Sequence, residues 1–302
     1  MRTVAVVLAG GSGVRLGGST PKQLLMLAGR TLLEHCVAAF DAAPGIDDVL
    51  VVMPAGLTGE ARRLLGPRYG KLRDVIEGGA DRPGSTSRAI AFLSRDGQER
   101  NVLFHDAARP LVDQRIIADC VAGLGTWEAL GVVVPTTDTI VEMEGGVMTA
   151  IPPRDTLGRC QTPQGFRLSV IRKAHELAAA DTSPGGFAPT DDCGIVLRYL
   201  PGVRVHVVRG SERNLKVTYP GDLRVAEAAL ADQAGSTGRG ELRIRVYLAQ
   251  GDGAAWSAVP AGSRLTRSGR KSAGPRTRPR RLVRNPVPQQ TCMVASTTGS
   301  QA

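Results

Sequence analysis

Four short runs of aliphatic and β-branched residues in the N-terminal part of the chain alternate with stretches that have helical length and apolar spacing. Such alternation is typical of βαβ units, whose parallel strands form one sheet with helices on both faces. We therefore expect an α/β fold with a Rossmann-like, doubly wound, mainly parallel sheet, and ligands beyond the carboxyl ends of its strands. The runs are residues 4–8, 48–53, 75–76 and 101–105, and the helical stretches are residues 31–42, 59–65, 85–94 and 114–123.

A less regular region follows a strand predicted at residues 131–134 and is expected to form a protruding β-arm. Residues 138–142 and 146–151 flank a Glu-Gly-Gly sequence in which glycine can supply the positive φ of a hairpin turn. We place this arm at about residues 137–160. Beyond it, the pattern predicts helices at residues 168–180 and 220–231, a Pro/Gly-rich loop at 182–189 and a strand at 203–208.

Positive charge is concentrated at the C-terminal end. Residues 1–230 hold 26 Lys and Arg against 25 Asp and Glu, a net charge of +1, whereas residues 231–302 hold 12 against 3, a net charge of +9. The basic segment is also rich in Gly, Ser and Pro, a composition that buries too little apolar surface to fold. We expect a folded domain over residues 1–234 and a mostly disordered tail over 235–302. The rival function from another class is weak nucleic-acid binding through this tail.

Cysteine usage and the N-terminus point to the cytoplasm. The five cysteines are scattered without a C-x-x-C pair, so we expect neither disulfides nor structural zinc. The apolar run that begins near the N-terminus is too short for a signal peptide, and no run approaches the length of a membrane span. We therefore expect no membrane association.

A Gly-rich loop after the first strand has the composition of a phosphate cradle, because its backbone N–H groups can turn inward toward oxygens. The dinucleotide pattern fails, since Leu16 stands where a third glycine belongs, and no Gly-Lys-Ser/Thr end marks a Walker P-loop. Instead the loop carries Arg15 and Lys22, whose charges would suit a pentacoordinate phosphorus and a departing pyrophosphate. The alternative is a solvated loop with ordinary surface cations.

Several further motifs follow in a fixed order, and together they carry a resemblance. They read Leu-Ala-Gly-Gly at residues 8–11, Pro-Lys-Gln at 21–23, Glu-Gly-Gly-Ala-Asp-Arg at 77–82, His-Asp-Ala-Ala-Arg-Pro at 105–110, Thr-Pro-Gln at 162–164 and Asn-Leu-Lys-Val-Thr at 214–218. Over about residues 3–231 the chain resembles the sugar-phosphate cytidylyltransferases. The resemblance implies transfer of CMP from CTP to a polyol phosphate with release of pyrophosphate. A nucleotidyltransferase that uses UTP or ATP is the rival enzyme.

The resemblance also implies roles for individual residues. Arg15, Lys22, Arg154 and Lys216 would be catalytic, the last two by aiming the acceptor oxygen at the α-phosphorus. Mg²⁺ is expected mainly on the triphosphate, with Asp106 at a strand's carboxyl end as its protein ligand. Acceptor-binding residues would be Arg109, Thr139 and Thr162, and CTP-binding residues would be Leu8, Ala9, Gly10, Gly11, Gly79, Ala80, Asp81, Arg82, Ser85 and Asp106.

Some of these positions have plainer interpretations. Gly78 and Gly79 could form an ordinary turn, and Arg154 could be a surface residue of the arm. For Asp222 we favour a role as a first-turn helix charge over a place in the site. Members of the family act as dimers whose β-arms are exchanged, so the resemblance implies a homodimer in which Arg154 serves the partner's site.

The acceptor is predicted from departures within the family's motifs. Arg154 precedes Asp155, and Thr-Asp-Asp-Cys stands at residues 190–193, both of which resemble enzymes that act on ribitol phosphate. The main expectation is therefore D-ribitol 5-phosphate, giving CDP-ribitol for teichoic-acid-like polymers. The alternative is 2-C-methyl-D-erythritol 4-phosphate, an isoprenoid precursor.

Overall fold

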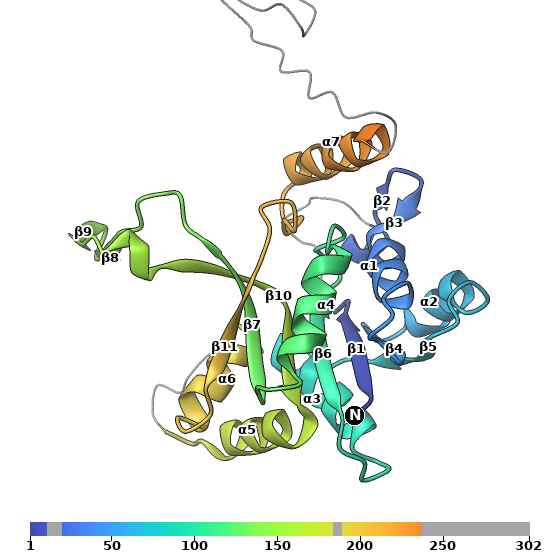
Figure 1. The fold of residues 1–302 in the computed structure, drawn as a ribbon, viewed down its shortest axis with the longest axis horizontal. Helices are drawn as coiled ribbons and strands as arrows, with labels where there is room; N and C mark the ends of the chain where they lie inside the picture. The colour runs from blue at the N-terminus through green and yellow to red at the C-terminus, as the bar shows by residue number, and fades with distance from the viewer. Residues whose placement is uncertain (11–19, 184–188, 237–302) are drawn as a thin grey trace, which may run out of the picture. The chain divides into compact units, whose positions relative to one another are not determined.

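The computed structural model describes residues 1–10, 20–183 and 189–236. Its central sheet has seven strands in the order β11-β7-β10-β6-β1-β4-β5 (Figure 1). Neighbouring strands are parallel, except that β10 runs antiparallel to both of its partners. The strands are β1 (Thr3–Leu8), β4 (Asp48–Met53), β5 (Leu72–Glu77), β6 (Asn101–Asp106), β7 (Ala129–Pro135), β10 (Gly158–Arg167) and β11 (Val205–Arg209).

Helices cover both faces of the sheet, because successive side chains of each strand point to opposite faces. In β1, Ala5 and Val7 belong to one buried cluster, and Val4 and Val6 belong to the other. The first cluster is completed by α1 (Leu32–Asp41), α2 (Thr58–Leu65) and α4 (Gln114–Gly123). The second is completed by α3 (Arg82–Leu93), α5 (Leu168–Ala180) and α6 (Asp192–Tyr199).

Smaller elements surround this core. A third apolar cluster packs α7 (Pro220–Ser236) near the short hairpin of β2 (Met26–Leu27) and β3 (Arg30–Thr31). The 3-10 helix η2 spans Lys22–Leu24, and a second, η3, spans Arg154–Thr156. Strands β8 (Glu142–Glu144) and β9 (Val147–Ala150) pair as a separate hairpin that projects from the ends of β7 and β10 (Figure 1).

These observations confirm the α/β class and the mainly parallel sheet. The hairpin turn has positive φ at Gly145 and Gly146, the two glycines of the predicted turn, whereas β8 begins later than the strand predicted at residues 138–142. Elements that were not expected from the sequence include the antiparallel strand β10, the helix α6 and the short hairpin of β2 and β3. None of the helices that the structure describes is long and apolar enough to span a membrane. The predictions for residues 237–302 lie outside the described residues.

Candidate active site

The site lies at the sheet edge where the parallel strands end. The chain passes from β1 to β4 on one side and later returns to β6 on the other. Leu8 and Asp106, which pair across β1 and β6, therefore mark the switch point beyond which sheets of this type bind ligands in a crevice. The end of β5 reaches the same edge, where the following loop leads into α3. This arrangement brings residues that are about a hundred positions apart in sequence to one place.

Glycines let the first turn of α3 pack against the strand ends. A Cβ on Gly79 would lie 2.5 Å from the carbonyl carbon of Gly84, and one on Gly10 would lie 3.0 Å from the Ser85 hydroxyl. The buried Ser85 Oγ donates to the Asp81 carbonyl at 2.8 Å and accepts from the Gly79 amide at 3.2 Å. Asp81 caps α3 by accepting from the Gly84 amide. Ser85 and Asp81 were predicted to bind CTP. In the structure their side chains form hydrogen bonds that hold the loop before α3 in shape.

Asp106, the last residue of β6, lies between two cations. Its Oδ2 is 2.8 Å from the Lys216 Nζ, and its Oδ1 is 3.3 Å from the Arg82 Nε. Burial alone would raise the pKa of Asp106, but the charges of Arg82 and Lys216 outweigh burial and hold this pKa well below its usual range. The carboxylate is therefore ionised at neutral pH.

A buried histidine fixes the backbone beneath Asp106. The Asp106 amide donates to the Thr162 hydroxyl at 3.1 Å, so that hydroxyl is left to donate to the His105 Nδ1, also at 3.1 Å. The His105 Nε2–H then donates to the Arg109 carbonyl at 3.0 Å, a tautomer assigned from the network. Burial lowers the pKa of His105 to about 4, which keeps the ring neutral as this network requires.

Arg109 adds a third cation and joins β6 to later parts of the chain. Its Nη1 donates to the Asn214 carbonyl at 2.9 Å, and its Nη2 donates to the Cys160 carbonyl at 3.3 Å. The side-chain Nδ2 of Asn214 in turn donates to the Thr162 carbonyl at 2.8 Å. We call Arg82, Asp106, Arg109 and Lys216 the carboxyl-edge cluster.

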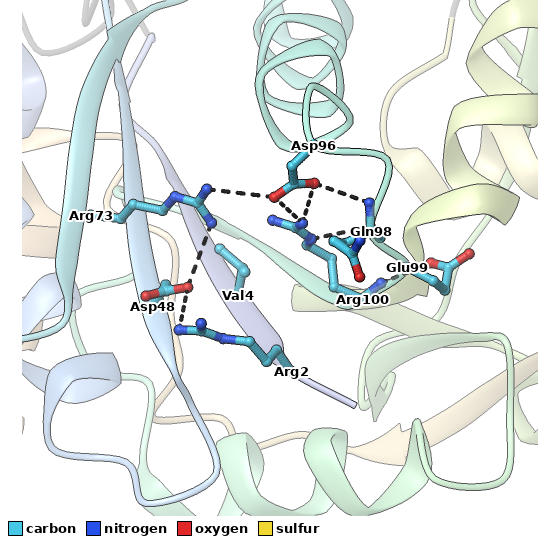
Figure 2. A pocket seen from close by; sticks show the side chains of 8 residues that line it. All are labelled: Arg2, Val4, Asp48, Arg73, Asp96, Gln98, Glu99 and Arg100. Carbon is cyan, nitrogen blue, oxygen red and sulfur yellow. Dashed lines mark hydrogen bonds and ion pairs between the residues drawn. The ribbon is translucent and has the colours of Figure 1, made fainter.

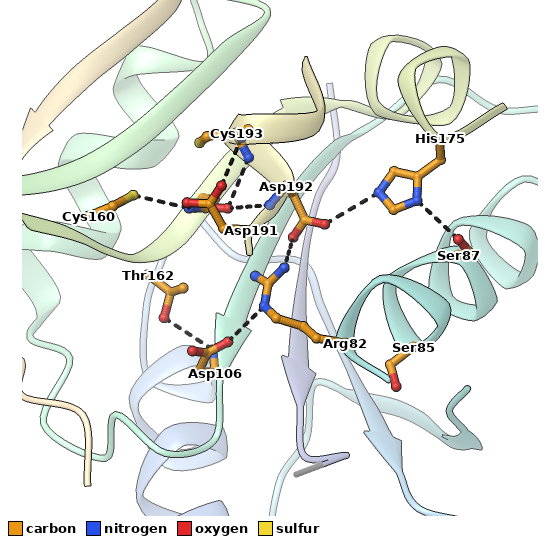
Figure 3. Close-up of polar contacts among 12 residues, drawn as sticks. Arg82, Ser85, Ser87, Asp106, Cys160, Thr162, His175, Asp191, Asp192 and Cys193 are labelled. Atoms are coloured by element: carbon orange, nitrogen blue, oxygen red, sulfur yellow. Dashed lines mark hydrogen bonds and ion pairs between the residues drawn. The ribbon is translucent and has the colours of Figure 1, made fainter. Parts of the chain in front are cut away.

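Arg82 is shared between two carboxylates (Figure 3). Its Nη1 lies 2.9 Å from Oδ2 of Asp192, at the start of α6, whose side chain is fully buried. The Nη2 of Arg82 and the Nε of Arg109 are buried and have no hydrogen-bond partner among the described residues. Three cations thus face one carboxylate at the crevice and a second behind it, and the guanidinium groups of Arg82 and Arg109 keep nitrogens without a hydrogen-bond partner among the described residues. The cluster is therefore suited to bind an anion.

A cavity of about 570 Å³ lies elsewhere, at the edge where β1 and β4 begin (Figure 2). Three arginines and three acids line it, and ion pairs join the arginines to Asp48 and Asp96. We call Arg2, Asp48, Arg73, Asp96 and Arg100 the amino-edge cluster. Its paired charges leave less for a ligand to satisfy than the charges of the carboxyl-edge cluster do.

The structure brings together many of the residues predicted for the site. Arg154 is in the β-arm, where its Nη1 donates to the Thr137 carbonyl rather than to a residue of the carboxyl-edge cluster. Thr139 also lies in the arm and is exposed. Lys22 begins η2 beside α1, and Gly11 and Arg15 lie outside the described residues. Gathered near the crevice or forming its walls are Leu8, Ala9, Gly10, Gly79, Ala80, Asp81, Arg82, Ser85, Asp106, Arg109, Thr162 and Lys216.

Two neighbours of the cluster were not singled out from the sequence, His105 and Asp192. For His105, the only sequence signal was its position next to Asp106 in the motif. Asp192 stood in a segment that was used only to compare acceptors. Asp222 was expected to be a first-turn helix charge. In the structure its carboxylate accepts from the backbone amides of Thr218 and Tyr219 at the start of α7.

Comparisons with known proteins agree with one another over the described domain. The family described as 2-C-methyl-D-erythritol 4-phosphate cytidylyltransferase matches residues 3–232. A relative with that name from Thermobifida fusca is 49% identical over 235 residues, which cover 76% of this chain and 93% of the relative. The crystal structure of the enzyme so named from Thermus thermophilus is 32% identical, with a TM-score of 0.59 over 75% of this chain and 98% of that one.

A relative whose name refers to CDP-ribitol has a lower sequence identity to this chain than the Thermobifida fusca protein. The bifunctional ribulose 5-phosphate reductase/CDP-ribitol pyrophosphorylase of Haemophilus influenzae is 36% identical over 229 residues. These residues cover 75% of this chain and 48% of that protein. Both kinds of relative share the part of the chain that contains the carboxyl-edge cluster.

Proposed function

This chain belongs to the 2-C-methyl-D-erythritol 4-phosphate cytidylyltransferase family, and we propose that it joins CTP to that acceptor with release of pyrophosphate. It is a cytidylyltransferase, and hence a nucleotidyltransferase. The observation that carries the proposal is the carboxyl-edge cluster, in which Arg82, Arg109 and Lys216 surround an ionised Asp106. Such an excess of cations suits two substrates that both carry phosphate.

The acceptor proposed here is the alternative of the sequence analysis, and ribitol 5-phosphate has less support. The ribitol expectation rested on a few loop residues, namely Arg154 with Asp155 and residues 190–193. Similarity over the whole domain is higher to the Thermobifida fusca relative than to the Haemophilus influenzae protein. Loop residues vary more readily than a domain's core, so the wider similarity is the stronger guide.

For CTP we propose the crevice between the end of β1 and the first turn of α3. The N-terminus of this 12-residue helix presents the positive end of its dipole, and Arg82 is its first residue. The close approach of Gly10 to Ser85 narrows the crevice, which favours a pyrimidine over a larger purine. The Nη2 of Arg82 is suited to a phosphate oxygen. Lys22 and Arg15 remain proposed as stabilisers of the reacting phosphate.

Magnesium fits this site as a companion of the triphosphate. No group of three or more His, Cys, Asp or Glu that could hold a metal occurs among the described residues, whereas Mg²⁺ needs only one or two carboxylates beside substrate phosphates. Asp106 is ionised and lies at the crevice, so it is the residue that would hold the ion. When bound, Mg²⁺ supplies neutralisation of triphosphate charge.

The acceptor needs positioning more than activation. A phosphate monoester is largely dianionic at pH 7, since its second pKa is about 6, so no general base is required. Lys216 and Arg109 lie within the cluster where they would orient this phosphate toward the α-phosphorus of CTP. Thr162 is already bound to the Asp106 amide and His105, so its proposed contribution is to hold the backbone that presents Asp106.

We also propose a homodimer with exchanged β-arms. Large apolar side chains of the hairpin and its flanks are exposed, as expected of a surface that packs on another chain. Arg154 lies in the same arm and would reach the acceptor in the partner's site, as would Thr139. The exposed apolar residues are Ile140, Met143, Val147, Met148 and Ile151.

Pyrophosphate release tests the reaction. Purified protein is incubated with Mg²⁺ and each of the four nucleotides, with either 2-C-methyl-D-erythritol 4-phosphate or D-ribitol 5-phosphate as acceptor. We expect release to be fastest with CTP and the methylerythritol acceptor. Faster release with ribitol 5-phosphate would contradict the acceptor, and no release with either would contradict the function.

Mixed dimers test the exchanged arm. Arg154→Ala and Lys216→Ala impair different parts of a composite site, so a dimer that contains one copy of each has one intact site. We expect mixing, followed by subunit exchange, to restore activity that neither variant shows alone. Verified heterodimers without restored activity would place Arg154 outside the partner's site.

A further inference from the structure

We propose that Asp192 is a positioning residue for the nucleotide, because it holds the Arg82 guanidinium in the orientation in which this group would meet the phosphates of CTP. The inference rests on the proposed function. Asp192 does not touch the crevice itself, since Arg82 stands between it and Asp106 (Figure 3). Its role is therefore separate from those of the residues that would bind substrate directly.

The burial of Asp192 shows how strongly it is coupled to Arg82. The side chain is fully buried, and Arg82 is the only Lys or Arg that forms an ion pair with it among the described residues. A buried carboxylate without a partner is costly, so Arg82 cannot turn away without leaving that charge unmatched. The Arg82 side chain as a whole retains 22% exposure, although its Nη2 is itself buried.

Further contacts hold Asp192 itself in place. Its Oδ1 lies 3.3 Å from the Nε2 of His175, whose Nδ1 is 3.0 Å from the Ser87 hydroxyl on α3. The Asp192 amide donates to the Gln164 side chain at 3.0 Å. Helices α5 and α6 and strand β10 thus support a carboxylate that faces the first residue of α3.

The two carboxylates restrict the guanidinium in different directions. Asp106 accepts from Nε at 3.3 Å, and Asp192 pairs with Nη1 at 2.9 Å, so Nη2 is the nitrogen left for a ligand. A planar, doubly anchored guanidinium loses less conformational freedom when it binds a phosphate oxygen. Without Asp192, Arg82 could swing toward Asp106 and cancel the charge that the nucleotide needs.

Asp192→Asn tests this role, because it removes the charge at nearly constant shape. We expect KM for CTP to rise about ten- to a hundredfold, and the Kd for CTP, measured by calorimetry without acceptor, to rise by the same factor. This factor corresponds to the free energy of one hydrogen bond to a charged group. KM for the acceptor should change by less than about threefold. Asp192→Glu, which restores the charge, should recover part of the CTP affinity.

Asp191→Asn is the matched control. Asp191 is the neighbouring carboxylate, but it caps α6 and contacts Gln164 rather than Arg82, and asparagine is an equally good N-cap. This variant should keep the KM for CTP. If Asp192→Asn fails to fold, His175→Gln tests the next link in the chain, with an expected rise in that KM of about threefold.

The results separate the two proposals. A folded Asp192→Asn protein with unchanged Kd and KM for CTP would overturn the positioning role, as would an equal loss of affinity for both substrates. If Asp192→Asn does not fold, an unchanged KM for CTP in His175→Gln would overturn it. Absence of CMP transfer in the unaltered protein would instead overturn the proposed reaction, while CTP calorimetry would still test Asp192.

Discussion

The two edges of the central sheet carry charged clusters of similar composition but opposite character. In the amino-edge cluster, Arg73 lies 3.6 Å from Asp48 and 3.8 Å from Asp96, and with Glu99 the acids that line the cavity equal the arginines in number. In the carboxyl-edge cluster, cations outnumber the carboxylate at the crevice, and buried Arg82 and Arg109 nitrogens have no hydrogen-bond partner among the described residues. Matched charges stabilise a surface, whereas unmatched ones bind a ligand.

The largest expected difference between the clusters is in catalysis. Lys216→Met removes a cation that would orient the acceptor phosphate, so we expect kcat/KM to fall about a hundred- to a thousandfold, as when one transition-state donor is lost. Arg73→Met removes an arginine of comparable exposure from the other edge and should leave kcat/KM near its original value. Equal losses in the pyrophosphate assay would erase the distinction between the two edges.

The next effect is on stability. Asp106→Asn leaves Arg82 and Lys216 without the carboxylate between them, so we expect the free energy of unfolding to fall by about 3 kcal/mol in urea titrations. Lys216 is partly exposed, which keeps the loss at the lower end of the range for broken buried pairs. Added inorganic pyrophosphate should restore part of the stability of this variant. Unchanged stability would mean that the cations do not depend on Asp106.

Acid should weaken the carboxyl edge through His105. Its pKa of about 4 in the folded protein lies below its ordinary 6.5, so the unfolded chain takes up the proton first as pH falls. The stabilisation is complete above pH 6.5 and is lost between that pH and about 4, with a loss on the order of 3 kcal/mol. The slope of unfolding free energy against pH in this interval should be smaller for His105→Gln. Identical slopes would contradict the neutral buried ring.

The smallest effect is expected for the stability of the amino edge. Arg73 is 36% exposed, and its two ion pairs are long, so Arg73→Met should change the free energy of unfolding by less than about 1 kcal/mol. The same change measured in 1 M salt should be smaller still, because salt screens exposed charges. A loss that exceeds that of Asp106→Asn would reverse the ranking of the two clusters.

The parallel part of the fold could be predicted because its strands are continuous apolar runs. Helix α4 was predicted at residues 114–123 and α5 at 168–180, the same limits as in the structure. Strand β10 was missed, because its Gly and Pro residues argue against a central strand. The structure accommodates Pro163 at a register shift between Gln161 and Gln164.

The site was predictable only where one motif held several of its residues. Asp106 and Arg109 share a motif, so their proximity was implied. Asp192 contacts Arg82 only because α6 and α3 lie on the same face of the sheet, a relation that no local pattern contains. Helix α6 itself was missed, although Asp191 gives it an N-cap and Ile195 and Val196 give it a buried face.

The place of β10 has a consequence for biosynthesis. Strands β6 and β7 are consecutive in the main sheet along the chain, yet the structure seats β10 between them. During translation β7 leaves the ribosome before β10, so the side of β6 that β10 covers lacks its native partner until residues 158–167 emerge. Premature β6–β7 pairing would close the gap and exclude Thr162. We therefore expect folding of this domain to be limited by the late insertion of β10, which refolding kinetics with and without a chaperone would measure.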